Sequence, residues 1–410
     1  MQGPTTQLTI PRAEFIALMG ALMALNALSI DIMLPAFPNI AADFGIEGNA
    51  IQYIILSYVL GFGSAQLFFG PVTDRFGRRP PLFAGLALFT VCAAAAPFAP
   101  DFTTLLVLRF LQGAGVAGTR VIALAAVRDT HSGRAMAATM SLVMMIFLAA
   151  PVLAPLVGQA IILVAPWGNI FGFMTLLSLI VTVWSAMRLQ ETLAPANRRD
   201  LSLRAVVQGF GLVISNRVSF FYTLATAFYF GSLFGFLSLA QPIFVDVYGL
   251  GAAFPLAFSS VSVLMAVASF LNSRAVERLG MRRLAHGALV IKIVVSLIAC
   301  IVFMTGYAPL WALLLTNGLV MPLFGLIAAN LNAIAMEPLG KIAGTAASVL
   351  GFAQTVVGGI VGAMVGQAFN GTVIPLVAGF FVLSAIALGF VAIAERGRLF
   401  GTSVQQTAGP

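Results

Sequence analysis

Long apolar runs alternate with short polar segments along nearly the whole chain of 410 residues. An α-helix rises 1.5 Å per residue, so about 20 apolar residues are needed to cross the hydrocarbon core of a bilayer. Twelve runs have about this length, at residues 14–35, 50–70, 81–99, 102–127, 135–164, 167–188, 217–247, 252–272, 284–305, 308–336, 342–368 and 371–394. This pattern predicts an all-α membrane protein with twelve transmembrane helices.

The longest polar segment, at about residues 189–216, divides these spans into two sets of six. We therefore predict an N-terminal six-helix half at residues 1–190, a cytoplasmic linker at 191–216 and a C-terminal six-helix half at 217–410. Two short repeats between the halves support this division, because Glu277–Arg283 resembles Asp74–Arg79 and Leu315–Gly318 resembles Leu111–Gly113.

The composition and the placement of charge favour a membrane protein over a soluble one. Hydrophobic residues make up 60% of the chain and charged residues 8%, whereas a soluble domain has roughly 25% charged residues. The net charge of +8 does not indicate nucleic-acid binding, because all but three of the 21 cations lie on one side of the predicted spans. Cationic loops face the cytoplasm, so we expect both termini there and no nucleic-acid partner.

Several function classes lack the residues that they need. Cys92 and Cys300 lie in apolar runs, and His131 and His286 stand apart from other ligating residues. We therefore expect neither a disulfide nor a metal site. No G-x-x-x-x-G-K-[ST] phosphate loop is present, so an ATP-driven pump within this chain is excluded. No catalytic pattern is present either, and we predict neither an enzyme nor a bound cofactor.

Four charged side chains lie within the short segment from Gly70 to Pro80. Prolines near its two ends predict a tight loop between two membrane helices. The segment fits the pattern G-x-x-x-D-R-x-G-R-R and so resembles the loop between the second and third helices of the major facilitator superfamily. This resemblance implies two parallel six-helix halves with a substrate site at mid-membrane between them.

Asp31, Arg109, Arg120 and Lys292 lie inside the predicted spans. A charge at the bilayer centre costs roughly 2.5–3.5 kcal/mol on insertion scales, so each needs a partner, water or a route to the surface. Helix rise places Asp31 about 26 Å and Arg109 about 27 Å from the cytoplasmic ends of their spans. Helices one and four are neighbours in this superfamily, so we infer an Asp31–Arg109 pair.

This pair has a structural and a functional interpretation. It can serve only to fix helix packing, or Asp31 can take up and release a proton under the opposing influences of burial and a nearby cation. Leu314 occupies the place of Arg109 in the second half. A purely structural pair is expected to be duplicated with the fold, so this asymmetry favours proton exchange.

The other two intramembrane cations are closer to the cytoplasmic side. Arg120 lies three helical turns from Arg109 and on the same face. It either lines the cytoplasmic mouth of the cavity and binds an anionic group, or snorkels to the inner surface. Lys292 lies about 12 Å into its span, and for it we expect snorkelling.

Two further segments extend the resemblance. Arg109–Gly115 is similar to the R-x-x-Q-G-x-G motif of drug:proton antiporters, whose arginine is linked in that family to proton coupling. Ala150–Gly158 resembles the span-five antiporter motif, with Ala154 in place of the usual central glycine. Pro151 and Pro155 are expected to bend this helix and to take part in gating.

Asp31–Pro38 and Glu337–Ala346 look like the Bcr/CflA subfamily, which includes exporters of bicyclomycin and of chloramphenicol-type drugs. Some relatives carry a second acid deeper in span one, but here that region, Met23–Asn26, has none. With Asp31 as the sole membrane carboxylate, the resemblance implies a neutral or singly charged substrate.

The resemblance also assigns a gating role to the loop at 70–80. Gly70 allows helices two and eleven to approach, Asp74 faces the start of helix eleven near Ile342, and Arg75 pairs with Asp129. Gly77 and Arg78 complete this latch. The alternative for Arg78 and Arg79 is that they only enforce topology.

Substrate-binding residues are expected where polar and aromatic side chains interrupt the spans, because pockets for drug-sized ligands are mostly apolar with a few polar anchors. The candidates are Asn26, Tyr58, Gln66, Arg120, Tyr229, Phe230, Phe234 and Gln241.

The sequence thus predicts a monomeric, proton-coupled antiporter in the bacterial inner membrane that exports small hydrophobic drugs by alternating access. Its expected partners are a small-molecule substrate, protons and membrane lipid. A same-fold exporter of a metabolite or sugar is the first alternative, and a channel or non-transporting receptor is a remote one. The identity of the drug and the proton stoichiometry stay open.

Overall fold

Membrane-length helices dominate the computed structural model, which describes residues 10–198 and 203–401. Within these residues, twelve helical segments are long and apolar enough to cross a membrane, and they fall close to the predicted runs. The predicted all-α membrane fold is confirmed. The segments are Arg12–Phe44, Gly48–Phe76, Arg79–Phe98, Phe102–Thr130, Ala138–Val164, Gly168–Arg188, Arg217–Val247, Gly251–Leu279, Met281–Met304, Leu310–Leu339, Ala346–Gln367 and Ile374–Ala394.

The chain divides into two units, residues 1–206 and 207–410. This boundary lies within the predicted linker at 191–216, of which residues 199–202 lie outside the described part. The linker contains an additional short helix, α8 (Leu203–Ser215). Each unit contains six of the membrane-length segments.

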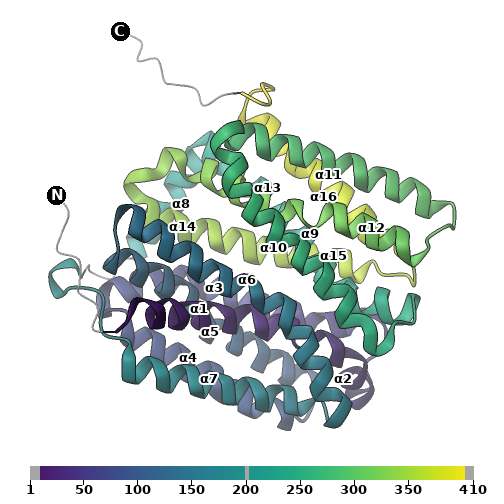
Figure 1. Ribbon diagram of the computed structural model, residues 1–410, viewed down its shortest axis with the longest axis horizontal. Helices are drawn as coiled ribbons and strands as arrows, with labels where there is room; N and C mark the ends of the chain where they lie inside the picture. Colours follow the sequence, from purple (N-terminus) through teal and green to yellow (C-terminus); the bar gives the residue numbers. More distant parts are fainter. Residues whose placement is uncertain (1–9, 199–202, 402–410) are drawn as a thin grey trace. The chain divides into compact units, whose positions relative to one another are not determined.

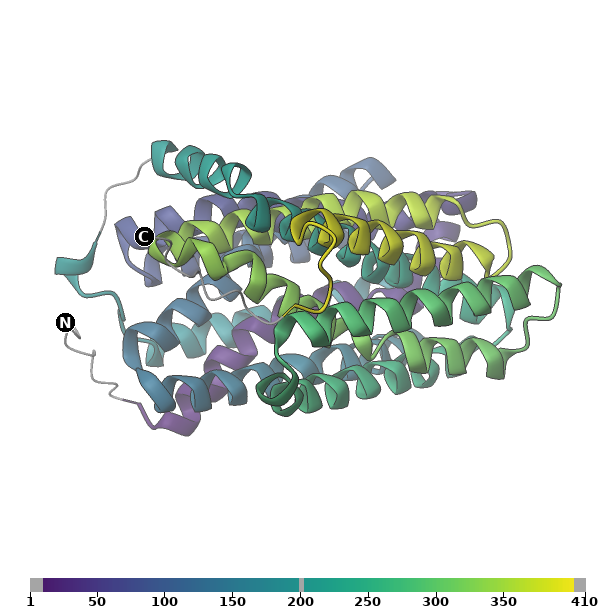
Figure 2. The same ribbon diagram turned by 90° about the horizontal axis from the view of Figure 1, so that it is seen from above.

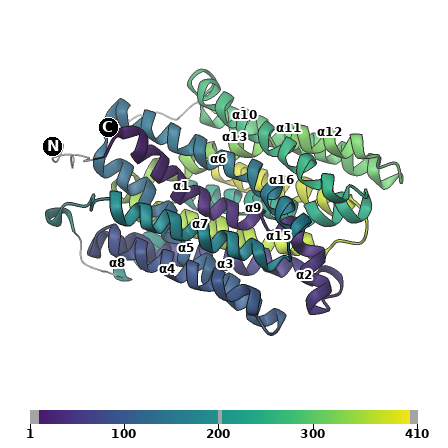
Figure 3. The same cartoon turned by 60° about the horizontal axis from the view of Figure 1, so that its bottom comes forward.

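The N-terminal unit is built on helices that approach each other closely. Its helices are α1 (Arg12–Asp31), α2 (Phe37–Phe44), α3 (Tyr53–Phe76), α4 (Arg79–Ala95), α5 (Phe102–Thr130), α6 (Gly133–Val164) and α7 (Gly168–Arg188). Helix α5 packs between α3 and α4, and α4 lies beside α7 (Figure 1). Helix α6 runs alongside α1 (Figure 3).

The C-terminal unit has more interrupted helices. Helix α11 packs along α16 (Figure 2), and α9 packs against α15 and α16. One span breaks at Met321–Pro322, and another passes through a π-helical turn at Ala353–Val357. Its membrane helices are α9 (Arg217–Gln241), α10 (Phe254–Leu279), α11 (Met281–Met304), α12 (Leu310–Val320), α13 (Leu323–Met336), α14 (Ala343–Phe352), α15 (Gly358–Gln367) and α16 (Ile374–Ala394).

The predicted loop at 70–80 is much shorter than expected, and this part of the prediction was wrong. Helix α3 continues through Pro71 to Phe76, and Pro80 lies in the first turn of α4. A proline in the first helical turn leaves no extra donor unpaired. Pro71 removes the backbone bond to the Leu67 carbonyl without ending the helix. Nearby, the Thr73 hydroxyl donates to the Gly70 carbonyl at 2.9 Å. Only Gly77 and Arg78 connect the two helices.

Candidate functional site

Asp31 is the last residue of α1. The sequence causes this ending, because Pro35 has no N–H to donate to the carbonyl of the residue four positions earlier, and its ring crowds that carbonyl. The Asp31 side chain is 5% exposed. Within the described part of the chain, its carboxylate makes no hydrogen bond and no ion pair. A break in the first membrane span therefore holds a buried acid without a fixed partner.

Arg109 lies in the middle of α5 and is fully buried. Its guanidinium donates to the Gln112 side-chain oxygen at 2.5 Å and to the Ser29 carbonyl oxygen at 3.0 Å. It also lies over the ring of Tyr58, 4.4 Å from the ring centroid, and 5.9 Å from that of Phe171. Aromatic faces and neutral oxygens thus surround this charge.

The predicted direct pair between Asp31 and Arg109 is absent from the described residues, so that part of the prediction was wrong. Arg109 instead binds the backbone at Ser29, two residues before Asp31. Carbonyls in the last turn of a helix have no partner within the helix, and the helix dipole favours a cation there. Arg109 therefore reaches the segment that carries Asp31 through the end of α1.

Glycines bring the surrounding backbones into contact. A Cβ atom on Gly113 would lie 2.1 Å from the Tyr58 carbonyl oxygen, and one on Gly61 would lie 1.9 Å from the Phe110 carbonyl oxygen. Helices α3 and α5 can approach this closely only because both positions lack a side chain. The close approach places the Tyr58 ring against Arg109 in the next turn of α5.

The span-five motif reaches the same region from the other side of α1. Pro151 and Pro155 both lie inside α6. A Cβ atom on Gly158 would lie 2.1 Å from the carbonyl oxygen of Ile32, the residue after Asp31. The arginine motif and the glycine that ends the span-five motif therefore both contact the backbone where α1 ends.

Two predicted substrate-binding residues belong to this cluster. The Tyr58 hydroxyl donates to the Asn26 side-chain oxygen at 3.1 Å, and both side chains are buried. Gln66 is also buried, two turns further along α3. Arg120 is half-buried on α5 and forms no hydrogen bond or ion pair within the described residues.

In the C-terminal unit, Lys292 is fully buried. Its ammonium donates to the Ser232 hydroxyl at 2.9 Å and lies 4.4 Å from the Tyr229 ring centroid. The predicted snorkelling of Lys292 was therefore wrong. Its side chain turns into the bundle, because Ser232 and two aromatic rings provide a polar and polarizable surrounding there.

The remaining predicted aromatic candidates lie close to Tyr229. The ring of Tyr229 stacks on that of Phe324 with 5.3 Å between the centroids, and the ring of Phe230 meets that of Phe324 edge-on with 5.0 Å between the centroids. The ring centroids of Phe234 and Phe230 are 6.3 Å apart. Gln241 is buried at the last residue of α9, three turns away from Tyr229.

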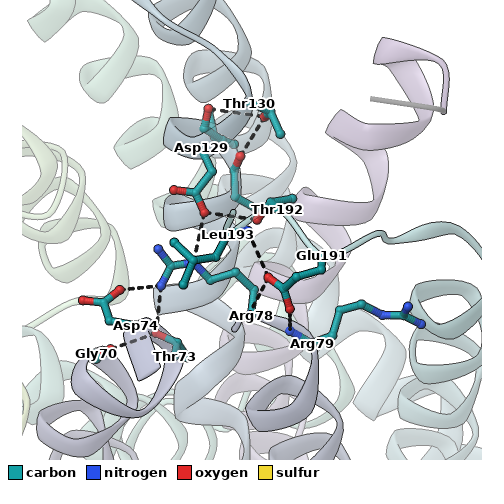
Figure 4. Close-up of polar contacts among 12 residues, drawn as sticks. Gly70, Thr73, Asp74, Arg78, Arg79, Asp129, Thr130, Glu191, Thr192 and Leu193 are labelled. Carbon is teal, nitrogen blue, oxygen red and sulfur yellow. Dashed lines mark hydrogen bonds and ion pairs between the residues drawn. The ribbon is translucent and has the colours of Figure 1, made fainter. Parts of the chain in front are cut away.

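A second cluster forms where α3 meets α4 (Figure 4). The Arg78 guanidinium donates to Asp129 at 3.0 Å, to Asp74 at 2.7 Å and to the Thr73 hydroxyl at 3.1 Å. Burial opposes the charge of Arg78, but the bonds to Asp129 and Asp74 outweigh burial and raise the pKa of the guanidinium above its ordinary value. Arg78 thus stays charged and joins the ends of α3 and α5.

This arrangement gives Asp129 a partner that the sequence analysis did not assign to it. Arg78 makes an ion pair with Asp129 at 3.0 Å, and the Arg75–Asp129 pair stays a prediction. Arg78 is 7% exposed, so the alternative that it only enforces topology is wrong. Asp74 pairs with Arg78, and the Ile342 side chain, the other predicted neighbour of Asp74, lies outside the described residues.

Glu191 completes this cluster, and the sequence interpretation missed it. Its carboxylate accepts hydrogen bonds from the backbone N–H groups of Arg78 at 2.8 Å and Arg79 at 3.1 Å (Figure 4). Gly77 makes room for it, because its φ is +90° and a Cβ atom would lie 2.4 Å from a Glu191 oxygen. Glu191 therefore packs against the loop between α3 and α4.

The C-terminal unit has a related cluster. Arg282 donates to Glu395 at 2.8 Å and to Glu337 at 2.9 Å. Glu337 lies near the end of the tenth span as Asp129 lies near the end of the fourth, and Glu395 follows the twelfth as Glu191 follows the sixth. This parallel is the sequence signal that could have revealed Glu191.

Comparison with known proteins covers nearly the whole chain. The family model of the Major Facilitator Superfamily matches residues 19–363. The uncharacterized MFS-type transporter YdgK of Bacillus subtilis is 32% identical, over 92% of this chain and 94% of that protein. The bicyclomycin resistance protein homolog of Haemophilus influenzae is 30% identical, over 88% of this chain and 91% of that protein.

A solved structure supports the fold. The bacterial homolog of the human lysosomal transporter Spinster, in an inward-facing and occupied conformation, matches with a TM-score of 0.74. The match covers 97% of this chain and 98% of that chain, at 16% identity. At this identity the likeness shows the fold alone.

Proposed function

The chain belongs to the Major Facilitator Superfamily, and we propose that it is a proton-coupled antiporter that exports small hydrophobic drugs by alternating access. Its similarity to a bicyclomycin resistance protein homolog supports drug export. The proposed substrates are bicyclomycin-like or amphenicol-like compounds. The proposed site of action is the bacterial inner membrane, where the chain works as a monomer with both termini in the cytoplasm.

The observation that carries this proposal is the buried carboxylate of Asp31 at the end of α1. An ion pair or several fixed donors would hold the carboxylate in its charged form. Asp31 has neither within the described residues, so its charge can change when the cavity opens to a different side. Protonation removes a negative charge two residues from the carbonyl that Arg109 holds. Charge on Asp31 and the Arg109 contact are therefore electrostatically linked.

The cluster around Arg78 supplies the proposed gate. It ties the ends of α3 and α5 to Glu191 through one buried cation and two backbone amides. These residues are expected to stay together or to separate as a unit, because the loss of one charged partner leaves a buried charge without its counter-charge. We assign the closure of the cytoplasmic side to this cluster and its counterpart around Arg282.

The test is substrate-induced proton release by purified protein in weakly buffered detergent solution. A panel contains chloramphenicol, florfenicol and bicyclomycin, with sugars and small metabolites as comparison compounds. The proposal predicts saturable proton release with at least one of the drugs and none with the comparison compounds. Release with a sugar or metabolite alone would indicate the alternative exporter, and downhill leak without saturation would indicate a channel.

A further inference from the structure

The ammonium group of Lys292 lies in the C-terminal unit and has no acidic partner among the residues that the structure describes. Its side chain is 0% exposed, and its one described hydrogen bond goes to the Ser232 hydroxyl at 2.9 Å. It lies 4.4 Å from the centroid of Tyr229 and 5.2 Å from that of Phe380. A desolvated ammonium gains about 2 kcal/mol or more from an aromatic face, so these rings partly offset the cost of the charge.

Arg109 has a closely similar environment in the N-terminal unit. Each cation is fully buried, bonds to one neutral side chain and lies 4.4 Å from a tyrosine centroid. The two side chains differ in chemistry, because a guanidinium keeps its proton in proteins and a buried lysine can lose it. In similar surroundings, Arg109 therefore keeps its charge in the N-terminal unit, whereas Lys292 can change its charge in the C-terminal unit.

Uncommitted hydroxyl groups accompany Lys292. The hydroxyls of Tyr229, Ser296 and Ser384 are buried and have no hydrogen-bond partner within the described residues. Ser296 follows Lys292 by one turn of α11, and Ser384 follows Phe380 by one turn of α16. A buried polar atom without a partner costs about 1–3 kcal/mol, so these hydroxyls are expected to bind something during the working cycle.

Hydroxyl groups suit both protonation states of a lysine. A hydroxyl oxygen accepts a hydrogen bond from an ammonium, and its O–H donates to the lone pair of an amine. A carboxylate in the same place would favour the ammonium alone. The pocket around Lys292 can therefore accommodate loss and uptake of one proton by rotation of hydroxyl groups.

The charged groups near this pocket do not compete for the proton. Tyr229 is the titratable side chain in contact with Lys292. Helices α12, α13 and α16 carry no charged side chain among their described residues. On α9 and α11, the other titratable side chains lie six or more residues along the chain from Tyr229 or Lys292, and are Arg217, Tyr222, Arg282, Arg283, His286 and Cys300. On α10 the titratable side chains are Arg274, Glu277 and Arg278.

We propose that Lys292 is a second proton-exchanging site, which cycles between ammonium and amine inside the C-terminal unit. On release, the N–H bond breaks, its electron pair stays on the nitrogen, and the proton leaves. A role for this exchange in transport rests on the proposed proton-coupled function, but the exchange itself does not. Together with Asp31, Lys292 would give each unit one group that changes charge.

The decisive experiment is a pH titration of Lys292 by NMR, with lysine labelled with ¹³C at Cε in full-length protein. The chain has only two lysines, Lys292 and Lys341, so Lys341→Arg leaves a single signal and Lys292→Arg assigns it. We expect that signal to move between its ammonium and amine positions within the pH range in which the protein stays folded. A signal that stays at either position throughout this range overturns the proposal.

One variant connects the exchange to the surroundings of Lys292. Tyr229→Phe removes the hydroxyl but keeps the ring, and is expected to shift the titration midpoint of Lys292. An unchanged midpoint would show that the Tyr229 hydroxyl does not bind Lys292 in its ammonium or amine form. The titration requires no transport, so Lys292 can titrate even if the protein proves not to be proton-coupled, and each idea fails on its own measurement.

Discussion

The guanidinium of Arg109 donates a hydrogen bond of 3.0 Å to the carbonyl oxygen of Ser29, two residues before Asp31. A direct ion pair would hold Asp31 in its charged form, whereas this contact leaves the carboxylate uncommitted. The end of α1 therefore carries both the acid and the carbonyl that Arg109 binds.

The ring of Tyr58 is expected to matter more than its hydroxyl. Tyr58→Phe keeps the face beneath Arg109 and loses the bond to Asn26, which costs about 1 kcal/mol. Tyr58→Leu also removes the aromatic face and is expected to cost about 2 kcal/mol more. Thermal unfolding in detergent and drug transport by both variants measure this difference. Equal effects of the two substitutions would show that the ring does not support Arg109.

Arg78 is expected to be the main stabilising cation of the loop cluster. Arg78→Gln removes the buried cation that pairs with Asp129 and Asp74, and we expect a loss of roughly 2–4 kcal/mol in unfolding free energy. Arg198→Gln provides a control, because Arg198 is exposed and its replacement should change stability by less than about 0.5 kcal/mol. Similar melting temperatures for the two variants would contradict the arrangement in Figure 4.

Gly77 and Gly280 form a matched pair for the role of Glu191. Both have positive φ, +90° and +77°, with extended ψ, so alanine adds about 1–3 kcal/mol of backbone strain at either position. Only at Gly77 does the new Cβ atom meet the Glu191 carboxylate, which three backbone N–H groups hold in place. We expect Gly77→Ala to be the more destabilising by about 1–3 kcal/mol in thermal melts. A larger destabilisation by Gly280→Ala than by Gly77→Ala would contradict the contact between Gly77 and Glu191.

The spans could be predicted because length and polarity alone decide whether a helix crosses a bilayer. The loop at 70–80 was predicted too long, because a proline signals a helix end but does not force one. At Pro71 helix α3 continues to Phe76. At Pro35 the same residue type does end α1.

Side-chain partners were less predictable than depth. The sequence placed Arg75 and Arg78 in the same loop, but only the turn at Gly77 determines that Arg78 faces Asp129. Lys292 gave no signal of its inward direction, because a long lysine side chain inside a span can either turn into the bundle or extend towards the surface. Leu314 takes the place of Arg109 in the second unit, and Lys292 supplies a buried cation there from a different helix.

The proposed coupling is tested most directly by Asp31→Asn in proteoliposomes, with drug accumulation driven by a pH gradient and drug counterflow measured in the same preparation. Asp43→Asn is the matched control, because Asp43 is an exposed acid in the same span that accepts a hydrogen bond from Trp167. We predict that Asp31→Asn loses gradient-driven accumulation but retains counterflow, whereas Asp43→Asn retains both. Gradient-driven accumulation by Asp31→Asn at the level of the unsubstituted protein would contradict the assignment of the proton to Asp31.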